Sequence, residues 1–341
     1  MDISASLLGF IQNATGNNVV ITVILSVLLV VLGFILLIKG ADMFVDGASK
    51  VAQKLKVPLI VIGLTIVAFG TSAPEAAISI TSACKNEAGI AVGNVIGSNI
   101  MNILVILGIS ALFAAVPVKK TTFKYEIPFT VIITVVLLLL GLDGEITFFD
   151  AIILLIFFAA FFAYLIILSK KGDSSSDEVE PLTEKDTVPK MILFIILGLI
   201  AIVLGSDFTV TGASEIAALL NVDSRIIGLT IVAFGTSLPE LVTSVTAAKK
   251  GCTDIAIGNI IGSNIFNILF VVGISGLVSP SPIAFRSDFI IDGIIAIVSV
   301  VLLFVLVAKN KKLGKGSGII MLCSYAAYFV YLLLQPLILG V

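Results

Sequence analysis

Two glutamates, each in a copy of the same short motif, are the residues of this chain best suited to chemistry. The octapeptide A-F-G-T-S-x-P-E occurs at Ala68–Glu75 and again at Ala233–Glu240, each time within an apolar stretch long enough to cross a membrane. An ionisable side chain at that depth costs at least about 2.5 kcal/mol unless it is paired or faces a polar cavity. Neither motif contains Lys or Arg, so a bound cation or a proton is the expected charge partner.

A proline precedes each glutamate and should break the helix that carries it. Pro74 and Pro239 lack an N–H, and each ring crowds a carbonyl one turn earlier. We therefore expect a bend that leaves main-chain carbonyls free at residues 68–71 and 233–236. Broken backbone is tolerated in a membrane only where it is buried in protein or faces water.

Hydroxyl and amide side chains surround both glutamates at helical spacing. Thr71, Ser72 and Glu75 share one side of a helix, and the second copy repeats them as Thr236, Ser237 and Glu240. A second repeated motif, G-N-x-x-G-S-N-x-x-N, places three more polar side chains at i, i+4 and i+8, namely Asn94, Ser98 and Asn102, then Asn259, Ser263 and Asn267. Hard cations such as Ca²⁺ and Na⁺ prefer such an all-oxygen set.

Not every polar residue of these motifs need be a ligand. Ser, Thr and Asn in membrane helices often serve only as interhelical hydrogen-bonding groups. That interpretation applies at least as well as a ligand role to Asn94, Asn99, Asn259 and Asn264. A ligand role is favoured for Ser98, Asn102, Ser263 and Asn267. The glycines of the second motif form G-x-x-x-G pairs, which allow close helix packing.

The composition places the chain among all-α polytopic membrane proteins. Hydrophobic residues make up 59% and charged residues 12% of the 341 residues, against about 25% charged in soluble domains. At about 20 apolar residues per span, ten transmembrane helices fit with short connections. We expect them near residues 19–39, 58–83, 89–115, 125–141, 148–168, 190–207, 224–248, 254–278, 288–308 and 317–338.

The two halves of the chain are copies of one another. Residues 47–112 align without a gap to residues 212–277 at a shift of 165, and 39 of the 66 positions are identical. Equivalent spans lie five apart, an odd number, so the copies should cross the membrane in opposite directions, as in secondary transporters. We therefore predict two inverted-topology repeats of five helices, at 1–168 and 190–341, joined by a polar cytoplasmic linker at 169–189.

Basic residues predict the orientation in the membrane. With both termini outside, 17 Lys and Arg residues face the cytoplasm and 3 face outward, which follows the positive-inside rule. We expect an integral protein of a prokaryotic cell membrane, surrounded by lipid, monomeric and without a nucleic-acid partner.

The paired G-T-S-x-P-E and G-S-N-x-x-N motifs resemble the two α-repeats of the sodium/calcium exchanger family, within the cation/calcium antiporter superfamily. The resemblance covers most of the chain and implies a Na⁺-driven Ca²⁺ antiporter that works by alternating access. It implies no enzyme activity and no cofactor beyond the transported ions. The first and sixth spans would be sliding gate helices.

The resemblance also implies a set of ion ligands. Glu75 and Glu240 would bind both Ca²⁺ and Na⁺. The main-chain carbonyls of Thr71 and Thr236 would bind Ca²⁺, and those of Ala68 and Ala233 would bind Na⁺. The side chains that would line Na⁺ sites are those of Thr71, Ser72, Ser98, Thr236, Ser237 and Ser263. Asn102 and Asn267 would complete the centre.

One departure from the family pattern bears on the counter-ion. Some relatives, including certain potassium-dependent exchangers, carry Asp where this chain has Asn267. With Asn102 and Asn267 at the centre, the site holds only two formal negative charges. One Ca²⁺ neutralises both charges, whereas three Na⁺ leave a charge of +1. We therefore expect electrogenic exchange that does not require K⁺.

Other functions remain open at this stage. The nearest alternative is a Ca²⁺/H⁺ antiporter that uses the same glutamates, although proton-coupled relatives usually carry an acidic residue where this chain has Gly97 and Gly262. A passive cation channel is disfavoured because no ring of identical filter loops is visible. An intramembrane enzyme is least favoured, since the chain contains no His and no evident nucleophile–base pair.

Overall fold

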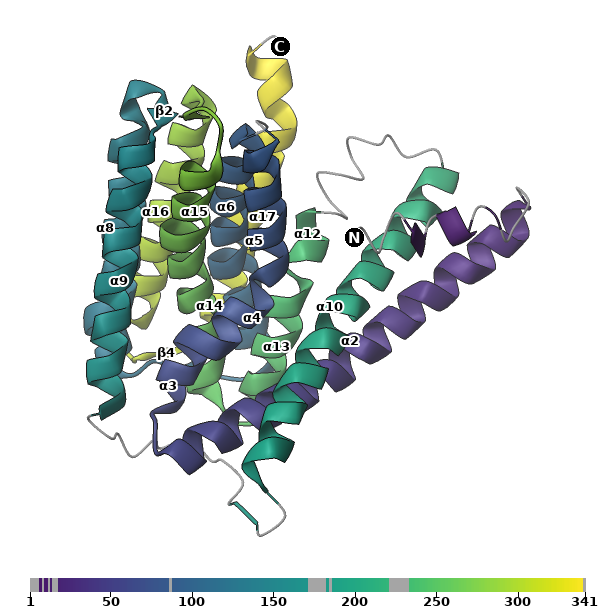
Figure 1. The fold of residues 1–341 in the computed structure, drawn as a ribbon, viewed down its shortest axis with the longest axis horizontal. Helices are drawn as coiled ribbons and strands as arrows, with labels where there is room; N and C mark the ends of the chain where they lie inside the picture. Colours follow the sequence, from purple (N-terminus) through teal and green to yellow (C-terminus); the bar gives the residue numbers. More distant parts are fainter. Residues whose placement is uncertain are drawn as a thin grey trace.

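The chain forms a bundle of long helices, seen in Figure 1. The computed structural model describes residues 6–7, 9–11, 13, 18–85, 88–170, 182–183, 186–220 and 233–339. Within these ranges, seven helices are long and apolar enough to cross a membrane, and a bent helix pair makes an eighth candidate. The membrane class is thereby confirmed, whereas the count of ten spans stays a prediction. The start of the expected seventh span, 224–232, and most of the linker lie outside the described residues.

The first half of the chain supplies the long helix α2, the unbroken helix α9 and three further helical rods. These are broken into shorter elements by π-helical turns, labelled η1 to η3, and by one 3₁₀ turn, η4. Their bounds are α2 Val19–Leu55, α3 Leu59–Ile62, η1 Gly63–Val67, α4 Ala68–Thr71, α5 Ala73–Cys84, α6 Ala88–Met101, η2 Asn102–Leu107, α7 Gly108–Phe113, β1 Val116–Pro117, η3 Thr122–Glu126, α8 Ile127–Leu140, η4 Gly141–Asp143, β2 Glu145–Ile146 and α9 Phe148–Lys170.

The second half follows the same order. Its bounds are α10 Val188–Leu219, α12 Ala233–Thr236, α13 Leu238–Lys249, α14 Thr253–Phe266, η6 Asn267–Val271, α15 Val272–Val278, β3 Ile283–Ala284, α16 Ser287–Ala308, β4 Lys312–Leu313 and α17 Lys315–Leu339.

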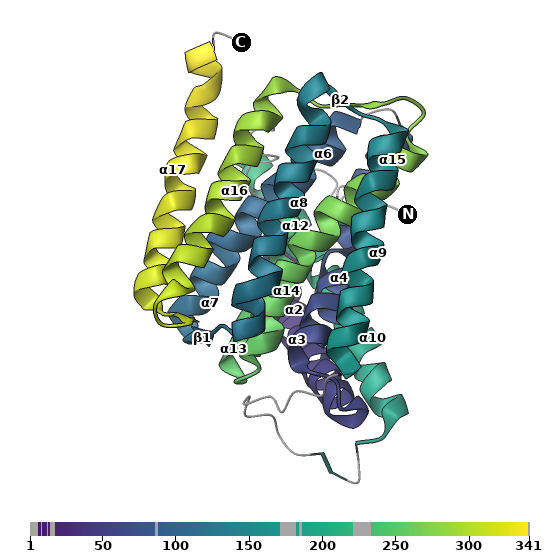
Figure 2. The ribbon, with the colours of Figure 1, turned by 90° about the vertical axis from the view of Figure 1, so that its left-hand side faces the viewer.

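Two short antiparallel strand pairs mark opposite ends of the bundle. Strand β1 pairs with β4, and β2 pairs with β3. Figure 2 places β1 and β2 at opposite ends. Because α7 leads into β1 and α15 leads into β3, the equivalent helices of the two copies run in opposite directions. This arrangement is the one that an inverted repeat predicts.

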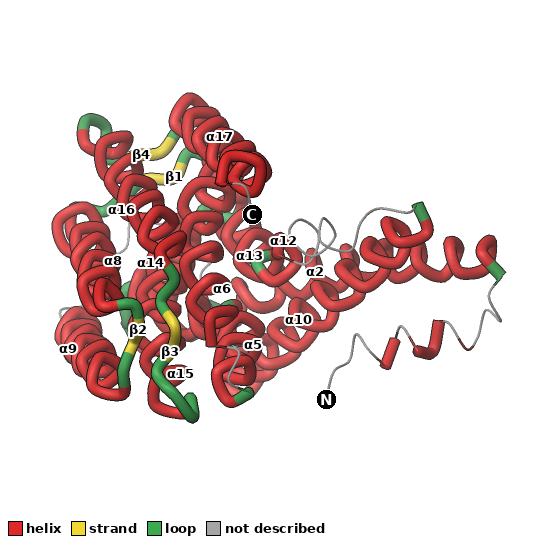
Figure 3. Tube along the Cα trace, turned by 90° about the horizontal axis from the view of Figure 1, so that it is seen from above, coloured by secondary structure: helices red, strands yellow, loops and turns green. Residues whose placement is uncertain are grey.

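Helices α2 and α10 are longer than the sequence predicted and lie side by side, extending away from the other helices (Figures 1 and 3). Their 37 and 32 residues correspond to about 55 and 48 Å, well beyond the ~30 Å hydrocarbon layer. The expected ends at residues 39 and 207 are therefore wrong. Helix α2 continues through its polar second half and stops only at Lys56, whose φ of 54° is left-handed, just ahead of Pro58.

Glycines at intervals of seven bring α2 and α10 into direct backbone contact. A Cβ on Gly40 would lie 2.8 Å from the carbonyl oxygen of Gly198, and one on Gly205 would lie 2.7 Å from that of Gly33. We call this set the glycine seam; it comprises Gly33, Gly40 and Gly47 on α2 and Gly198, Gly205 and Gly212 on α10. The six positions are related by the repeat shift of 165, so the seam is duplicated with the rest of the chain.

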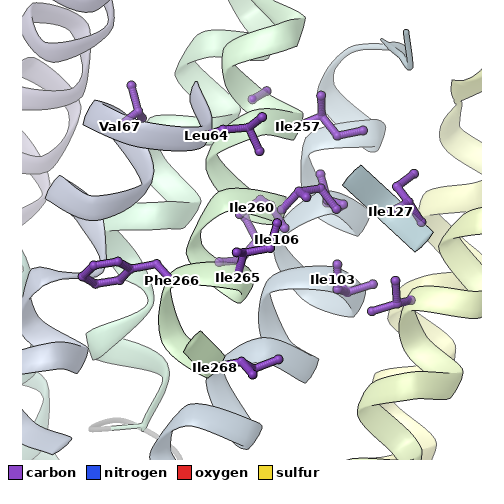
Figure 4. Packing of buried hydrophobic residues seen from close by; sticks show 14 of the residues in the cluster. Leu64, Val67, Ile103, Ile106, Ile127, Ile257, Ile260, Ile265, Phe266 and Ile268 are labelled. Carbon is purple, nitrogen blue, oxygen red and sulfur yellow. The ribbon is translucent and has the colours of Figure 1, made fainter. Parts of the chain in front are cut away.

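Helix α14 forms the centre of the bundle, and every one of its residues is buried. Figure 4 shows Ile257 and Ile260 of this helix packed among residues of the first half such as Leu64 and Ile106. A Cβ on Gly262 would lie 2.7 Å from the Cα of Leu64, so this glycine permits the close approach that its motif predicts. For the first copy, the corresponding contacts would involve residues 228–229, which lie outside the described residues.

Ion pairs at one end of the bundle fasten neighbouring segments. Lys119 pairs with Asp254 in the first turn of α14, at an N–O distance of 2.6 Å. Lys50 of α2 pairs with Asp186, just before α10, at 2.8 Å. The hydrogen bond from Lys50 holds the pKa of the Asp186 carboxyl below its usual range. Both pairs lie at the end to which the positive-inside rule assigns the cytoplasm.

The glycine seam predicts an unusually size-sensitive position at Gly198. In the Gly198→Ala variant the new methyl group would lie 2.7 Å from the amide nitrogen of Phe44, so α2 and α10 must separate. We expect a loss of about 1–3 kcal/mol of stability, measured by thermal unfolding in detergent. Gly316→Ala is the matched control, because no described atom lies within 4 Å of the position that its new methyl group would take. Equal unfolding temperatures for the two variants would contradict close packing at the seam.

Candidate cation-binding site

Both copies of the proline motif bend where the sequence predicts. Helix α4 ends at Thr71, Ser72 leaves the helical region with ψ of 7°, and α5 resumes at an angle of 53°. The second copy repeats the break at Ser237, with ψ of 2°, between α12 and α13. The prolines occupy the first turn of the new helices, where the missing N–H costs no hydrogen bond.

The expectation that the carbonyls at these bends are free is wrong for at least three of them, including that of Phe234, which accepts the amide of Ser237 at 3.2 Å. The Ala68 carbonyl accepts the amide of Ser72 at 3.0 Å, because the break is only one residue wide and an i+4 bond survives across it. The Gly235 carbonyl accepts the hydroxyl of Ser206 at 2.6 Å. The Ala68 carbonyl also accepts the Thr71 hydroxyl at 3.3 Å. A carbonyl oxygen has two lone pairs, so that of Gly235 can accept one further contact.

The two glutamates are buried and short of partners. Glu75 and Glu240 lie in the first turns of α5 and α13, and each is 1% exposed. Neither oxygen of Glu75 has a hydrogen-bond partner, whereas Glu240 Oε1 accepts the Ser72 hydroxyl at 2.8 Å and its Oε2 has none. The carboxylates are close enough to interact electrostatically, and no described Lys or Arg pairs with either. A bound cation would supply the opposite charge and would also contact the unpartnered carboxylate oxygens.

Two asparagines present oxygens because their amide nitrogens are bound elsewhere. Asn102 donates to Asn264 Oδ1 at 3.0 Å, and Asn267 donates to Asn99 Oδ1 at 3.2 Å. Asn99 and Asn264 are fixed in turn, since each donates to the other's main-chain carbonyl at 3.2 and 3.1 Å. The Oδ1 atoms of Asn102 and Asn267 are consequently buried acceptors without a donor.

Asn99 and Asn264 therefore act as positioning residues, a role that the sequence did not distinguish from ordinary packing. The π-helical turns that begin at Asn102 and Asn267 were also not predicted. Such turns insert one extra residue and are frequent at functional sites. In the sequence, the one indication of these features was that the residues are identical in the two copies. Many residues that only pack are identical in the two copies as well.

The outer asparagines fasten neighbouring helices. Asn94 donates to Ser79 Oγ at 3.0 Å, and Asn259 donates to Ser244 Oγ at 2.9 Å. Both also reach the main-chain carbonyl of the nearby glutamate at 3.4 Å. These contacts favour the packing interpretation of the two residues.

The remaining predicted residues lie at or beside this centre. Thr71 Oγ1 donates to Asn259 Oδ1 at 3.0 Å, and Ser263 Oγ donates to the Ala68 carbonyl at 3.4 Å, so both contacts join the two copies. Ser237 Oγ is buried without a partner, and Ser98 is buried. Ala233 and Thr236 are the first and last residues of α12.

Six buried side-chain oxygens of the predicted site have no hydrogen-bond partner, and they define its chemistry. They are Glu75 Oε1 and Oε2, Glu240 Oε2, Asn102 Oδ1, Asn267 Oδ1 and Ser237 Oγ. Buried polar atoms are normally hydrogen-bonded, so six unpartnered oxygens among the residues of one site indicate that they bind a ligand. Only two of the contributing residues are acidic, and the described residues contain no cluster of three or more His, Cys, Asp or Glu side chains. The oxygen set fits hard cations such as Ca²⁺ and Na⁺.

Comparisons with known proteins agree with this chemistry. The profile of the family described as sodium/calcium exchanger protein matches residues 25–167 and 190–334. Sodium/calcium exchanger MaX1 of Methanosarcina acetivorans is 35% identical, over 87% of this chain and 95% of its own length. Inner membrane protein YrbG of Escherichia coli is 30% identical, over 86% and 92%. A solved structure of the exchanger NCX_Mj without Na⁺ and Ca²⁺ superposes with a TM-score of 0.79 at 34% identity, over 90% of this chain and 99% of that one.

The asparagine contacts predict an effect from a residue that is not itself a ligand. In Asn264→Ala, the Asn102 amide loses its acceptor and is free to turn its nitrogen towards the carboxylates. We expect about tenfold weaker Ca²⁺ binding, measured by isothermal titration on the purified protein. Ser299→Ala is the control, because its hydroxyl bonds only within α16. Unchanged affinity in Asn264→Ala would show that the pair does not position Asn102.

Proposed function

Because this chain belongs to the sodium/calcium exchanger protein family, a family of membrane cation antiporters, we propose that it exchanges Na⁺ for Ca²⁺ by alternating access to a single buried site. The observation that carries the proposal is the group of six unpartnered oxygens around Glu75 and Glu240. The ligands would be the two carboxylates, the amide oxygens of Asn102 and Asn267, and nearby hydroxyl and carbonyl oxygens. These last come from Ala68, Thr71, Ser72, Ser98, Ala233, Thr236, Ser237 and Ser263.

The charge of the site explains why transport would be coupled. Two carboxylates buried without a cation carry a desolvation cost of several kcal/mol each. An empty site would therefore be unable to close away from water, whereas a site loaded with Ca²⁺ or with Na⁺ could. Since only loaded forms cross between the two faces, each Ca²⁺ movement in one direction requires Na⁺ movement in the other.

The repeat supports the ten-span arrangement with a site at its centre. Within the described part of the chain, the broken elements can be joined into ten helical rods: α2, α3–α5, α6–α7, α8, α9, α10, α12–α13, α14–α15, α16 and α17. Rods 2 and 7 carry the glutamates, and rods 3 and 8 carry the asparagines, so each half supplies one half of the site. We place both termini outside, because Lys50, Lys119 and Lys250 lie at the opposite end.

Ion flux in sealed proteoliposomes tests the function. Ca²⁺ uptake should follow an imposed outward Na⁺ gradient and should not follow a pH gradient alone. The Glu75→Gln and Glu240→Gln variants should each lose almost all uptake, because one carboxylate fewer leaves Ca²⁺ without its charge balance. Uptake driven only by the pH gradient would instead establish a Ca²⁺/H⁺ antiporter, and uptake without any coupling gradient would indicate a channel.

The two-charge site also predicts the electrical and ionic character of exchange. Replacing one Ca²⁺ by three Na⁺ changes the net charge of the loaded site from 0 to +1, so transport should respond to membrane potential. A K⁺ diffusion potential set with valinomycin should change the rate of uptake at fixed Na⁺. Substituting choline for K⁺ at constant potential should leave the rate unchanged, and a rate that rises steeply with K⁺ would contradict the prediction.

A further inference from the structure

We propose that Lys250 and Lys85 act as alternating latches, each holding one of the long helices against the bundle in one of the two access states, an inference that rests on the exchange function proposed above. The Lys250 latch is closed in this structure. The Lys85 latch would close when the opposite side of the site is sealed.

The Lys250 latch ties α2 to the end of α13. Lys250 directly follows α13, and its Nζ lies 2.7 Å from Asp46 Oδ1 and 3.3 Å from Asp42 Oδ1. It also donates to the main-chain carbonyl of Asp42 at 3.1 Å. Asp42 and Asp46 are four residues apart on α2, so both carboxylates face the same lysine. This is a contact between helices and is separate from the ion site.

The repeat places an equivalent set of residues on the other half of the chain. At the shift of 165, Asp42 corresponds to Asp207 of α10, and Lys85, at the end of α5, corresponds to Lys250. A contact between Asp207 and Lys85 would therefore be the mirror of the contact between Asp42 and Lys250. Figure 1 shows that α5 and α13 end at opposite ends of the bundle, as two gates on two sides require.

The structure is asymmetric in these contacts. Helix α2 packs against α13, but among the described residues α10 makes no comparable contact with α5. Lys85 is exposed and forms no ion pair with a described residue. In an inverted repeat, exchanging the conformations of the two halves converts one access state into the other. The exchanged state thus opens the Lys250 contact and forms the Lys85 contact.

The glycine seam couples the two latches mechanically. Asp42 lies two residues from Gly40, and Asp207 lies two residues from Gly205, so both latch positions adjoin the seam. Because the backbones of α2 and α10 touch there, the helices move most easily as one body. Movement that brings Asp207 towards Lys85 then withdraws Asp42 from Lys250.

The two latches are not equally strong. Lys250 meets two carboxylates, whereas the position equivalent to Asp46 on α10 is Thr211. Partly exposed ion pairs support population shifts of about two- to fivefold each. The extra carboxylate therefore favours the state in which the Lys250 end is closed, and added salt should reduce that preference.

Reversible cross-linking tests the exchange of contacts. Cysteine pairs replace Asp42 and Lys250, or Lys85 and Asp207, in full-length protein whose three native cysteines are changed to Ala. A short bis-methanethiosulfonate reagent is used, since an aspartate–lysine pair spans more than a disulfide allows. We expect the first pair to cross-link in resting protein and the second to cross-link chiefly during turnover with Na⁺ and Ca²⁺. Each link should block exchange until a reductant removes it.

Changing the residues at positions 46 and 211, where the two halves differ, tests the preference for the state in which the Lys250 latch is closed. Asp46→Thr weakens the Lys250 latch, and Thr211→Asp adds a carboxylate beside the Lys85 latch. Each should raise the rate of cross-linking between positions 85 and 207 about two- to fivefold in resting protein. Lys119→Gln is the control, because its partner Asp254 maps onto Gly89, which has no carboxylate, so this ion pair has no mirror contact.

The outcomes separate this inference from the proposed function. Wild-type protein that performs no Na⁺/Ca²⁺ exchange would refute the function itself. Wild-type protein that exchanges normally, while positions 85 and 207 never cross-link during turnover, would overturn the alternating latches. So would an equal effect of Asp46→Thr and Lys119→Gln on the cross-linking rate.

Discussion

Two carboxylates buried without a basic partner are the constraint on which the rest of the structure depends. Glu75 and Glu240 lie at the starts of α5 and α13, where the helix breaks at residues 72 and 237 expose them to one another. Beyond the Ser72 hydroxyl, which donates to Glu240 Oε1, the asparagines beside the carboxylates must offer oxygen and keep their donors turned away. The asparagine contacts achieve this by binding the amide nitrogens of Asn102 and Asn267 away from the centre. The polar residues around the site thus serve to keep its acceptors available for a cation.

Much of the site could be predicted from sequence because its parts are local and duplicated. The bend follows from the proline of each motif, and the ligands follow from spacing along one helix. Contacts between the copies have no such spacing, so the pairing of Asn99 with Asn264 required the structure. The lengths of α2 and α10 were missed for a different reason. Hydropathy falls where Asp42, Asp46 and Lys50 begin, but those charged residues are compatible with helix and continue it.

The molecule combines an enclosed core with two long helices that are packed differently. Helix α14 is buried along its whole length among apolar side chains, where any shift would create voids. Helices α2 and α10 contact each other through glycines, and α2 is held to the end of α13 by partly exposed charges at Lys250. Partly exposed ion pairs such as those at Lys250 can be broken at little cost in free energy. The fold therefore separates a rigid binding centre from the elements that can move beside it.

The reciprocal contact of Asn99 and Asn264 has the form of an isologous interface, in which one surface meets an identical copy of itself. The single chain is, in this respect, a homodimer whose two subunits share one polypeptide. In a true homodimer, every substitution appears twice, and the two sides must remain the same. Joining the subunits removes that restriction. A residue such as Thr211 can then differ from its counterpart Asp46, and the protein can prefer one of two orientations that symmetry would make equal.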